Sequence, residues 1–231
     1  MLHATITSVR RATPSTRIVR VRPDRAPFHY RPGQAAEIAP ESAGSLTPYS
    51  IASSPEETGR DGEFEFLVKT DAQGSWGDHY PPPGRGQRLR LRGPLGGFVF
   101  PARPSERRFL FIAGGTGIAP LRAMIRHGRA KGQGRLRLLY SARTPLDFAY
   151  RRELCGMARR GEIDLTLTAT RDVTDKWKGE RGRITRTQLA ALLDDPETLC
   201  FVCGPVPMVD DVPRMLQDLG VDRSRISVEE F

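Results

Sequence analysis

Three glycines that follow an apolar run are the residues of this chain best suited to hold a ligand. Residues 109–113 are apolar and lead into Gly114, Gly115 and Gly117, with Pro120 close behind. Such a run predicts a buried parallel strand that turns into a helix, where Pro120 fits the first turn. Glycine lets the backbone approach a ligand, and the free N–H groups at a helix start attract an anion. The spacing therefore predicts a phosphate site.

The glycine spacing is not diagnostic by itself. It departs from G-x-G-x-x-G at the third glycine, where Pro120 stands, and no Gly-Lys-Ser/Thr follows. A P-loop is thereby excluded. A strand-to-helix turn without any ligand stays the alternative at this point.

The cysteines and histidines do not predict a metal site or a disulfide framework. Three cysteines, an odd number, favour a reducing compartment. Cys200 and Cys203 form a C-x-x-C, but they fall on a predicted strand, where residues three apart point to opposite faces. The histidines are scattered along the chain: His3, His29, His79 and His127.

Length and charge limit the remaining classes. The chain has 231 residues, enough for two small domains, and its formal charge of +9 is spread along it, which predicts a positive surface field. No zinc spacing, helix-turn-helix pattern or stacking-aromatic module accompanies the charge, so a nucleic-acid partner is not expected. The sequence offers no apolar leader or membrane-length span, which predicts a cytoplasmic protein that does not bind a membrane.

The first hundred residues predict an antiparallel β-barrel. Strand-like alternation marks residues 16–22, 63–69 and 87–92, and a Pro-Gly turn at 32–33 leads into a strand at 35–38. One helical piece is expected around Ser75 to Tyr80, ended by three prolines at 81–83.

The remainder predicts an α/β domain. A polar stretch at 100–106 with two prolines predicts a linker, which gives domains 1–101 and 107–231. Strands at 136–140, 163–167, 199–203 and 226–229 are expected to alternate with helices at 118–130, 145–159, 185–193 and 206–219. That order predicts a parallel sheet with helices on both faces and a ligand at the carboxyl ends of its strands.

Three further motifs carry a family resemblance. They are Pro48-Tyr49-Ser50 within residues 48–55, Cys203-Gly204-Pro205 with Met208, and the terminal residues 228–231. Together with the glycine stretch, and in this order, they resemble the ferredoxin–NADP reductase superfamily over nearly the whole chain. The resemblance implies an N-terminal FAD-binding barrel and a C-terminal nicotinamide-nucleotide domain, with the reactive rings meeting at the cleft between them.

The resemblance implies a flavin site in the barrel. Tyr49 would stack on the isoalloxazine, and the Ser50 hydroxyl would hydrogen-bond near the atom that takes the hydride. Gly74 and Ser75 would open the short helix that cradles the flavin phosphates, or Ser75 would be a plain N-cap. In the family an arginine usually opens this motif and contacts the flavin phosphate, but here the position is Thr47. A nearby arginine would have to take over that contact. The choice between FAD and FMN therefore stays open. The site also takes in Pro48, Val68 and Lys69, and residues 93–98 look like the family's G-P-x-G-x-F turn.

The resemblance also implies a nucleotide site with catalytic residues Ser50, Cys203 and Glu229. Cys203 would position the hydride-bearing carbon, and the terminal Phe231 would cover the flavin until nicotinamide displaces it. Alternatively, Cys203 is an inert buried cysteine, and Phe231 belongs to a frayed chain end. The other residues implied to bind the nucleotide are Gly115, Thr116, Gly117, Pro120, Gly204, Pro205 and Met208.

Two arginines bear on the choice of nucleotide. Arg143 and Arg171 each follow a predicted strand, and Arg171 resembles the phosphate clamp of the NADP-using branch. We expect NADP, with NAD possible, because a 2′-phosphate needs a cation. Solvated surface charges are the alternative.

The implied function is a flavoprotein reductase that passes single electrons from FAD to a small acidic carrier such as a ferredoxin or flavodoxin. The chain lacks the cysteine cluster of an iron–sulfur centre, so the next carrier must be another molecule. The alternatives are a reductase subunit of an oxygenase or other complex, a reductase of free flavin or ferric chelates, and a non-catalytic module, which Thr47 would favour.

Overall fold

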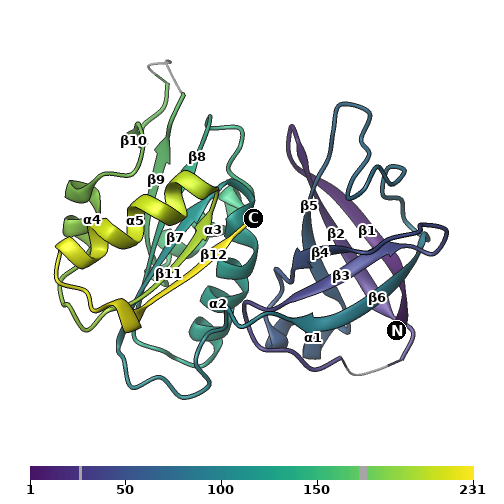
Figure 1. The fold of residues 1–231 in the computed structure, drawn as a ribbon, viewed down its shortest axis with the longest axis horizontal. Coiled ribbons are helices and arrows are strands. Elements are labelled where there is room, and N and C mark those ends of the chain that lie inside the picture. Colours follow the sequence, from purple (N-terminus) through teal and green to yellow (C-terminus); the bar gives the residue numbers. More distant parts are fainter. Residues whose placement is uncertain (26–27, 172–175) are drawn as a thin grey trace. The chain divides into compact units, whose positions relative to one another are not determined.

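The computed structural model describes residues 1–25, 28–171 and 176–231. These residues form two compact units, drawn in Figure 1. The first comprises Met1–Phe100 with Arg122–His127, and the second comprises Pro101–Leu121 with Gly128–Phe231. Each unit is built on a six-stranded sheet.

The sheet of the first unit is antiparallel, as predicted. Its order is β4-β3-β6-β1-β2-β5, and a bridge from Ile51 to Phe66 connects the chain after β4 to β5. This closes the sheet toward a barrel around a core that includes Val19, Val21 and Phe64. The strands are β1 (Leu2–Thr13), β2 (Thr16–Pro23), β3 (Ala35–Pro40), β4 (Thr47–Ser50), β5 (Phe64–Lys69) and β6 (Arg88–Leu95).

The first unit also has a helix that the sequence analysis missed, α1 (Pro55–Asp61). Ser54 caps it: the Ser54 side chain accepts from the Glu57 N–H, and the Glu57 carboxylate accepts from the Ser54 N–H. Gly62 ends the helix in the left-handed conformation. The Ser-x-x-Glu signature of a capping box was present in the sequence and would have located the helix.

The helix expected around Ser75 to Tyr80 does not exist. Gly74, Gly77 and His79 all have positive φ, and Trp76 and Tyr80 exchange backbone hydrogen bonds as a small bridge. The Asp71 carboxylate accepts the N–H of Ser75 at 2.8 Å and that of residue 73 at 2.9 Å. An aspartate that bonds the backbone locally favours a turn over a helix, which explains the error.

The sheet of the second unit is parallel, which confirms the predicted α/β class. Its order is β10-β9-β8-β7-β11-β12, with β7 and β11 adjacent in the middle. The carboxyl ends of these strands therefore share one edge of the sheet. The strands are β7 (Arg108–Gly114), β8 (Arg135–Ala142), β9 (Asp164–Ala169), β10 (Glu180–Arg181), β11 (Leu199–Gly204) and β12 (Ile226–Glu230).

Helices cover both faces of the parallel sheet (Figure 1). Side chains of α4 (Arg186–Leu192) and α5 (Val206–Asp218) share a core with Ile112 and Val202 on one face. On the other face Phe111 stacks on Phe201 with ring centres 5.4 Å apart, and this face carries α2 (Ile118–Ala130) and α3 (Arg151–Arg159). Short 3-10 turns precede α2 (η1, Gly115–Gly117) and β12 (η2, Arg223–Arg225).

Helix α3 begins at Arg151, six residues later than the expected start at 145. The N–H and hydroxyl of Thr144 both donate to the Asp147 carboxylate, and Tyr150 has a positive φ of 58°. This local turn takes the place of the first helical turns. None of the helices in the described part of the chain has the length and apolarity to cross a bilayer.

Candidate nucleotide and flavin sites

The carboxyl ends of β7 and β11 meet at their glycines. A Cβ on Gly204 would lie 3.3 Å from the Gly114 Cα atom, and one on Gly117 would lie 2.2 Å from the Cys203 carbonyl oxygen. The two turns are therefore packed backbone against backbone, with no room for a side chain. The structure brings together the glycine stretch and the Cys-Gly-Pro motif, which are far apart in sequence.

The two helices that start next to the paired glycines lack a side-chain cap. The turn that leads from Gly114 into α2 has none, and neither has α5 after Pro205. In contrast, α4 begins with a capping box made by Thr185 and Gln188. An uncapped helix start leaves backbone N–H groups for a ligand, and its dipole favours an anion. The residues present fit a dinucleotide phosphate group.

Tyr140 holds the glycine turn in place, a role that the sequence analysis missed. Its fully buried hydroxyl donates to the Gly115 carbonyl oxygen at 2.9 Å and accepts the Ala149 N–H at 3.2 Å. Burial raises the pKa of the phenol well above its ordinary value. Because Gly115 has a positive φ of 55°, this hydrogen bond stabilises a conformation that few residues adopt.

Cys203 and Glu229 are paired across β11 and β12. Burial raises the pKa of the Cys203 thiol, and the Glu229 charge raises it further. Burial also raises the pKa of Glu229 to about 7. Cys203 therefore remains a neutral thiol at neutral pH and is suited to packing beside a ring rather than to nucleophilic attack.

Met208 and Phe231 complete the predicted set at this edge. The Met208 sulfur lies 2.8 Å from the place that a Cβ on Gly114 would take, and the Phe231 ring lies 3.6 Å from that of Gly115. The Phe231 side chain is 56% exposed. The terminal ring thus lies next to the glycine turn but remains open to solvent.

Arg143 and Arg171 also lie together. The Arg171 N–H donates to the Arg143 carbonyl oxygen at 2.8 Å, in the turns after β8 and β9. Both side chains are exposed, and neither forms an ion pair with any residue that the structure describes. Two unneutralised guanidinium groups at the nucleotide edge suit a phosphate.

In the first unit, Tyr49 is held in a fixed position. Its ring centre is 5.8 Å from that of Trp76, and the two ring planes are tilted by 44°. Burial raises its pKa to about 12, so the phenol is neutral. Ser50 follows on the same strand, half-buried, with no hydrogen-bond partner for its hydroxyl among the described residues. A half-exposed ring beside a free hydroxyl fits a planar flavin.

Thr47 supplies no charge to this site. Its hydroxyl is 2.9 Å from that of Tyr80, which donates its own proton to the Ser45 carbonyl oxygen. Thr47 must therefore be the donor, with its hydroxyl committed to the barrel. Lys69 is exposed at the end of β5. It precedes Thr70, which forms a bridge to Trp76, so Lys69 places a cation beside the loop at residues 71–80.

The other predicted flavin residues differ in what they can offer. The Val68 side chain is fully buried in the barrel core, so that only its backbone can reach a ligand. Pro48 is exposed on β4. The N–H groups of Gly74 and Ser75 are both used by Asp71, so the predicted helix-start cradle is absent. No three His, Cys, Asp or Glu side chains gather as a metal site would require within the described residues.

The fold and the two sites define a pyridine-nucleotide-dependent flavoprotein oxidoreductase, and the comparisons with known proteins agree. Residues 3–100 match the oxidoreductase FAD-binding domain and residues 111–214 the oxidoreductase NAD-binding domain. The chain belongs to the ferredoxin–NADP reductase superfamily.

Two relatives and one solved structure illustrate the membership. Ferredoxin–NAD(P)(+) reductase CarAd of Metapseudomonas resinovorans is 32% identical over 100% of this chain and 69% of its own length. Ferredoxin–NADP reductase B of Sorangium cellulosum is 33% identical over 91% of this chain and 88% of its own length. The structure of the ferredoxin reductase in carbazole 1,9a-dioxygenase has a TM-score of 0.83 and 31% identity, and this chain covers 69% of it.

Proposed function

We propose that this chain, an NAD(P)H-dependent flavoprotein, prefers NADPH and delivers electrons singly from FAD to a separate small acidic carrier. Bound FAD supplies the chemistry that connects a two-electron donor to a one-electron acceptor. We assign residues 1–101 to flavin binding and 107–231 to nucleotide binding. The pair Arg143 and Arg171 carries the proposal, because it is free of described ion pairs and lies at the same edge of the sheet as the uncapped starts of α2 and α5.

The side chains take the following roles in this proposal. Tyr49 stacks on the flavin, and Ser50 donates a hydrogen bond to it. Cys203 packs beside the nicotinamide and sets its position. Glu229 holds a proton below pH 7 and is charged above it. A negative charge favours a positive charge that develops beside it, so we expect hydride transfer to quicken as pH rises through about 7.

Replacing Arg171 tests the nucleotide preference. Arg171→Ala removes a charged hydrogen-bond donor, and we expect the ratio of kcat/KM for NADPH to that for NADH to fall about ten- to hundredfold. Arg152→Ala is the matched control, because Arg152 is equally exposed in the same unit but lies on α3. An unchanged ratio for Arg171→Ala would exclude the assignment.

The positive charge of the chain supports an acidic carrier. A net charge of +9 would attract an acidic partner, and salt would screen that attraction. We expect the reduction rate of an acidic ferredoxin or flavodoxin to fall as ionic strength rises. A rate that does not depend on ionic strength would contradict this partner. A cytoplasmic location accords with the three free thiols, Cys155, Cys200 and Cys203.

The alternative acceptors are an oxygenase component and free flavin or ferric chelates. The structural relative from a carbazole dioxygenase system supports the first. Thr47 favours free flavin or ferric chelates, since a flavin without a cationic anchor would dissociate more readily. Gel filtration distinguishes the two: flavin that stays with the protein supports bound FAD as an electron carrier, and flavin that is lost supports flavin as a substrate.

A further inference from the structure

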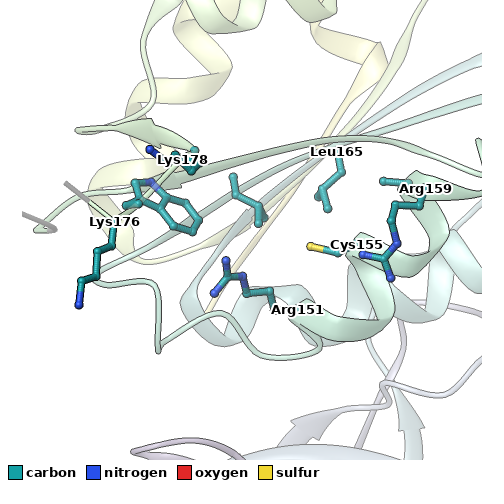
Figure 2. A pocket seen from close by; sticks show the side chains of 10 residues that line it. Arg151, Cys155, Arg159, Leu165, Lys176 and Lys178 are labelled. Atoms are coloured by element: carbon teal, nitrogen blue, oxygen red, sulfur yellow. The ribbon is translucent and has the colours of Figure 1, made fainter. Parts of the chain in front are cut away.

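The second unit has a pocket that none of the proposed nucleotide residues lines. Its volume is about 400 Å³, and it lies between α3, β9 and residues 176–179 (Figure 2). Leu165 and Leu167 of β9 and Ala158 and Cys155 of α3 form an apolar floor. A volume of this size is within the range of small-molecule sites.

The Trp177 indole is the fixed wall of this pocket. Phe148 stacks on it with ring centres 5.3 Å apart and planes 14° apart, and its Nε1–H donates to the Glu180 carbonyl oxygen at 2.7 Å. The Arg151 guanidinium lies 5.1 Å from the ring centre. The side chain is almost entirely buried, at 6% exposure. The pocket is therefore held open by packed side chains.

Four cations surround the apolar floor, and no acidic residue lines the pocket among the residues that the structure describes. Figure 2 shows Cys155 between Arg151 and Arg159 on α3, with Lys176 and Lys178 contributed by the opposite segment. All four are exposed. None forms an ion pair with any residue in the described ranges.

Other arginines close to this pocket in sequence do form ion pairs. Arg160, next to Arg159, pairs with Glu162 at 2.8 Å, and Arg135 pairs with Asp164 at 2.7 Å. Like charges gathered at one concave surface repel each other and produce a positive potential that an anion would relieve.

We propose that this pocket binds a small organic polyanion, an apolar ring or short chain with two or more carboxylate or phosphate groups. The apolar floor of Leu165 and Leu167 takes the hydrocarbon part, and the cations at the rim take the acidic groups. An inorganic anion would leave the floor uncovered, and a neutral apolar molecule would leave the cations unpaired. The concave shape favours a small molecule over a protein surface.

Cys155 reports on occupancy. It is half-buried in the pocket, whereas Cys200 and Cys203 are fully buried and their thiol pKa values are raised. The uncharged reagent 4,4′-dithiodipyridine should therefore react first with Cys155. We expect naphthalene-2,6-dicarboxylate to slow that reaction with a dissociation constant below about 1 mM. Inorganic phosphate and the neutral naphthalene-2,6-dimethanol should each protect at least about fivefold more weakly.

Substitutions of the cations locate the binding. Arg159→Gln and Lys178→Gln should each weaken the dicarboxylate about two- to fivefold. The matched control is Arg152→Gln, since Arg152 is exposed on the same helix but does not line the pocket. Calorimetric titration measures the same constants without the thiol.

Three results would overturn the proposal. They are no dicarboxylate binding by either method, equal weakening in Arg152→Gln, and binding only of an acidic protein. Arg171→Ala should leave the dicarboxylate constant unchanged. That outcome separates this pocket from the nucleotide preference proposed above, whichever of the two proposals fails.

Discussion

The two units hold their candidate sites by different means. In the second unit the backbone makes the site: glycines pack against each other, and two helices begin without caps. In the first unit side chains make it: Tyr49 and Ser50 lie on a strand beside a loop whose own N–H groups are used by Asp71. The candidate nucleotide site is thus formed before a ligand arrives, whereas the described residues of the first unit offer the flavin no uncapped helix start of this kind.

This difference explains why one departure from the family pattern matters. A backbone site tolerates changes in side chains, but a side-chain site depends on each of them. The resemblance leads us to expect an arginine at position 47, where this chain has a threonine whose hydroxyl is bonded to Tyr80. We therefore expect nucleotide binding to be robust and flavin binding to be the weaker function. Four substitutions test the comparison.

The largest effect is expected from Gly117→Ala. The new Cβ would lie 2.2 Å from the Cys203 carbonyl oxygen, and neither backbone can move away. We expect the free energy of unfolding of the second unit to fall by about 3 kcal/mol and NADPH binding to be lost. Urea unfolding monitored by Trp177 fluorescence, with Trp76→Phe present in both variants, measures the loss of stability. Gly44→Ala, which meets nothing within 4 Å, is the control. Equal stability of the two variants would contradict the backbone-built site.

The next effect is a gain of flavin affinity in Thr47→Arg. A guanidinium would add a charged hydrogen bond to the flavin phosphate, so the dissociation constant should fall about ten- to hundredfold. Quenching of flavin fluorescence on titration with apoprotein measures it. Thr47→Val loses the bond to Tyr80 but adds no charge, and should give no gain. If Thr47→Arg binds no more tightly than the wild type, another cation such as Lys69 already serves the phosphate.

Glu229→Gln should change how stability depends on pH. Burial raises the Glu229 pKa from the ordinary 4.5 to about 7, so the folded state keeps a proton that the unfolded state has lost. Stability should therefore fall as pH rises from about 4.5 to about 7. Because the side chain is partly exposed, the loss should be about 1 to 2 kcal/mol. Urea midpoints at pH 5 and 8 should show this loss in the wild type and in the Glu230→Gln control, but not in Glu229→Gln.

The smallest effect is expected from Tyr140→Phe. Losing the hydroxyl leaves the Gly115 carbonyl and the Ala149 N–H without partners, at a cost of about 1 kcal/mol. NADPH affinity should fall about two- to fivefold, with flavin affinity unchanged. Tyr80→Phe should lower flavin affinity and leave NADPH affinity unchanged, because the Tyr80 hydroxyl supports Ser45 and Thr47 in the first unit. Matching losses of both ligands in either variant would show that the two sites are not independent.

Periodic elements were the most predictable part of the fold. The parallel and antiparallel sheets, and helices such as α2 and α5, were predicted because apolar spacing reports which face is buried. The helix predicted around Ser75 to Tyr80 was wrong, since Asp71 bonds the backbone locally and favours a turn. Helix α1 was overlooked although its Ser54 and Glu57 capping box was visible.

The sequence by itself determined the two kinds of sheet and the family, and it nominated candidate residues for both sites, because strand periodicity and motifs are local properties of the chain. Only the tertiary structure decided which of those residues meet. Tyr140 bonds Gly115 across 25 positions, and Thr47 bonds Tyr80 across 33. Arg151 and Lys178 gather at one pocket from separate elements. Contacts between distant segments depend on how strands are ordered and packed, and no local pattern records that order.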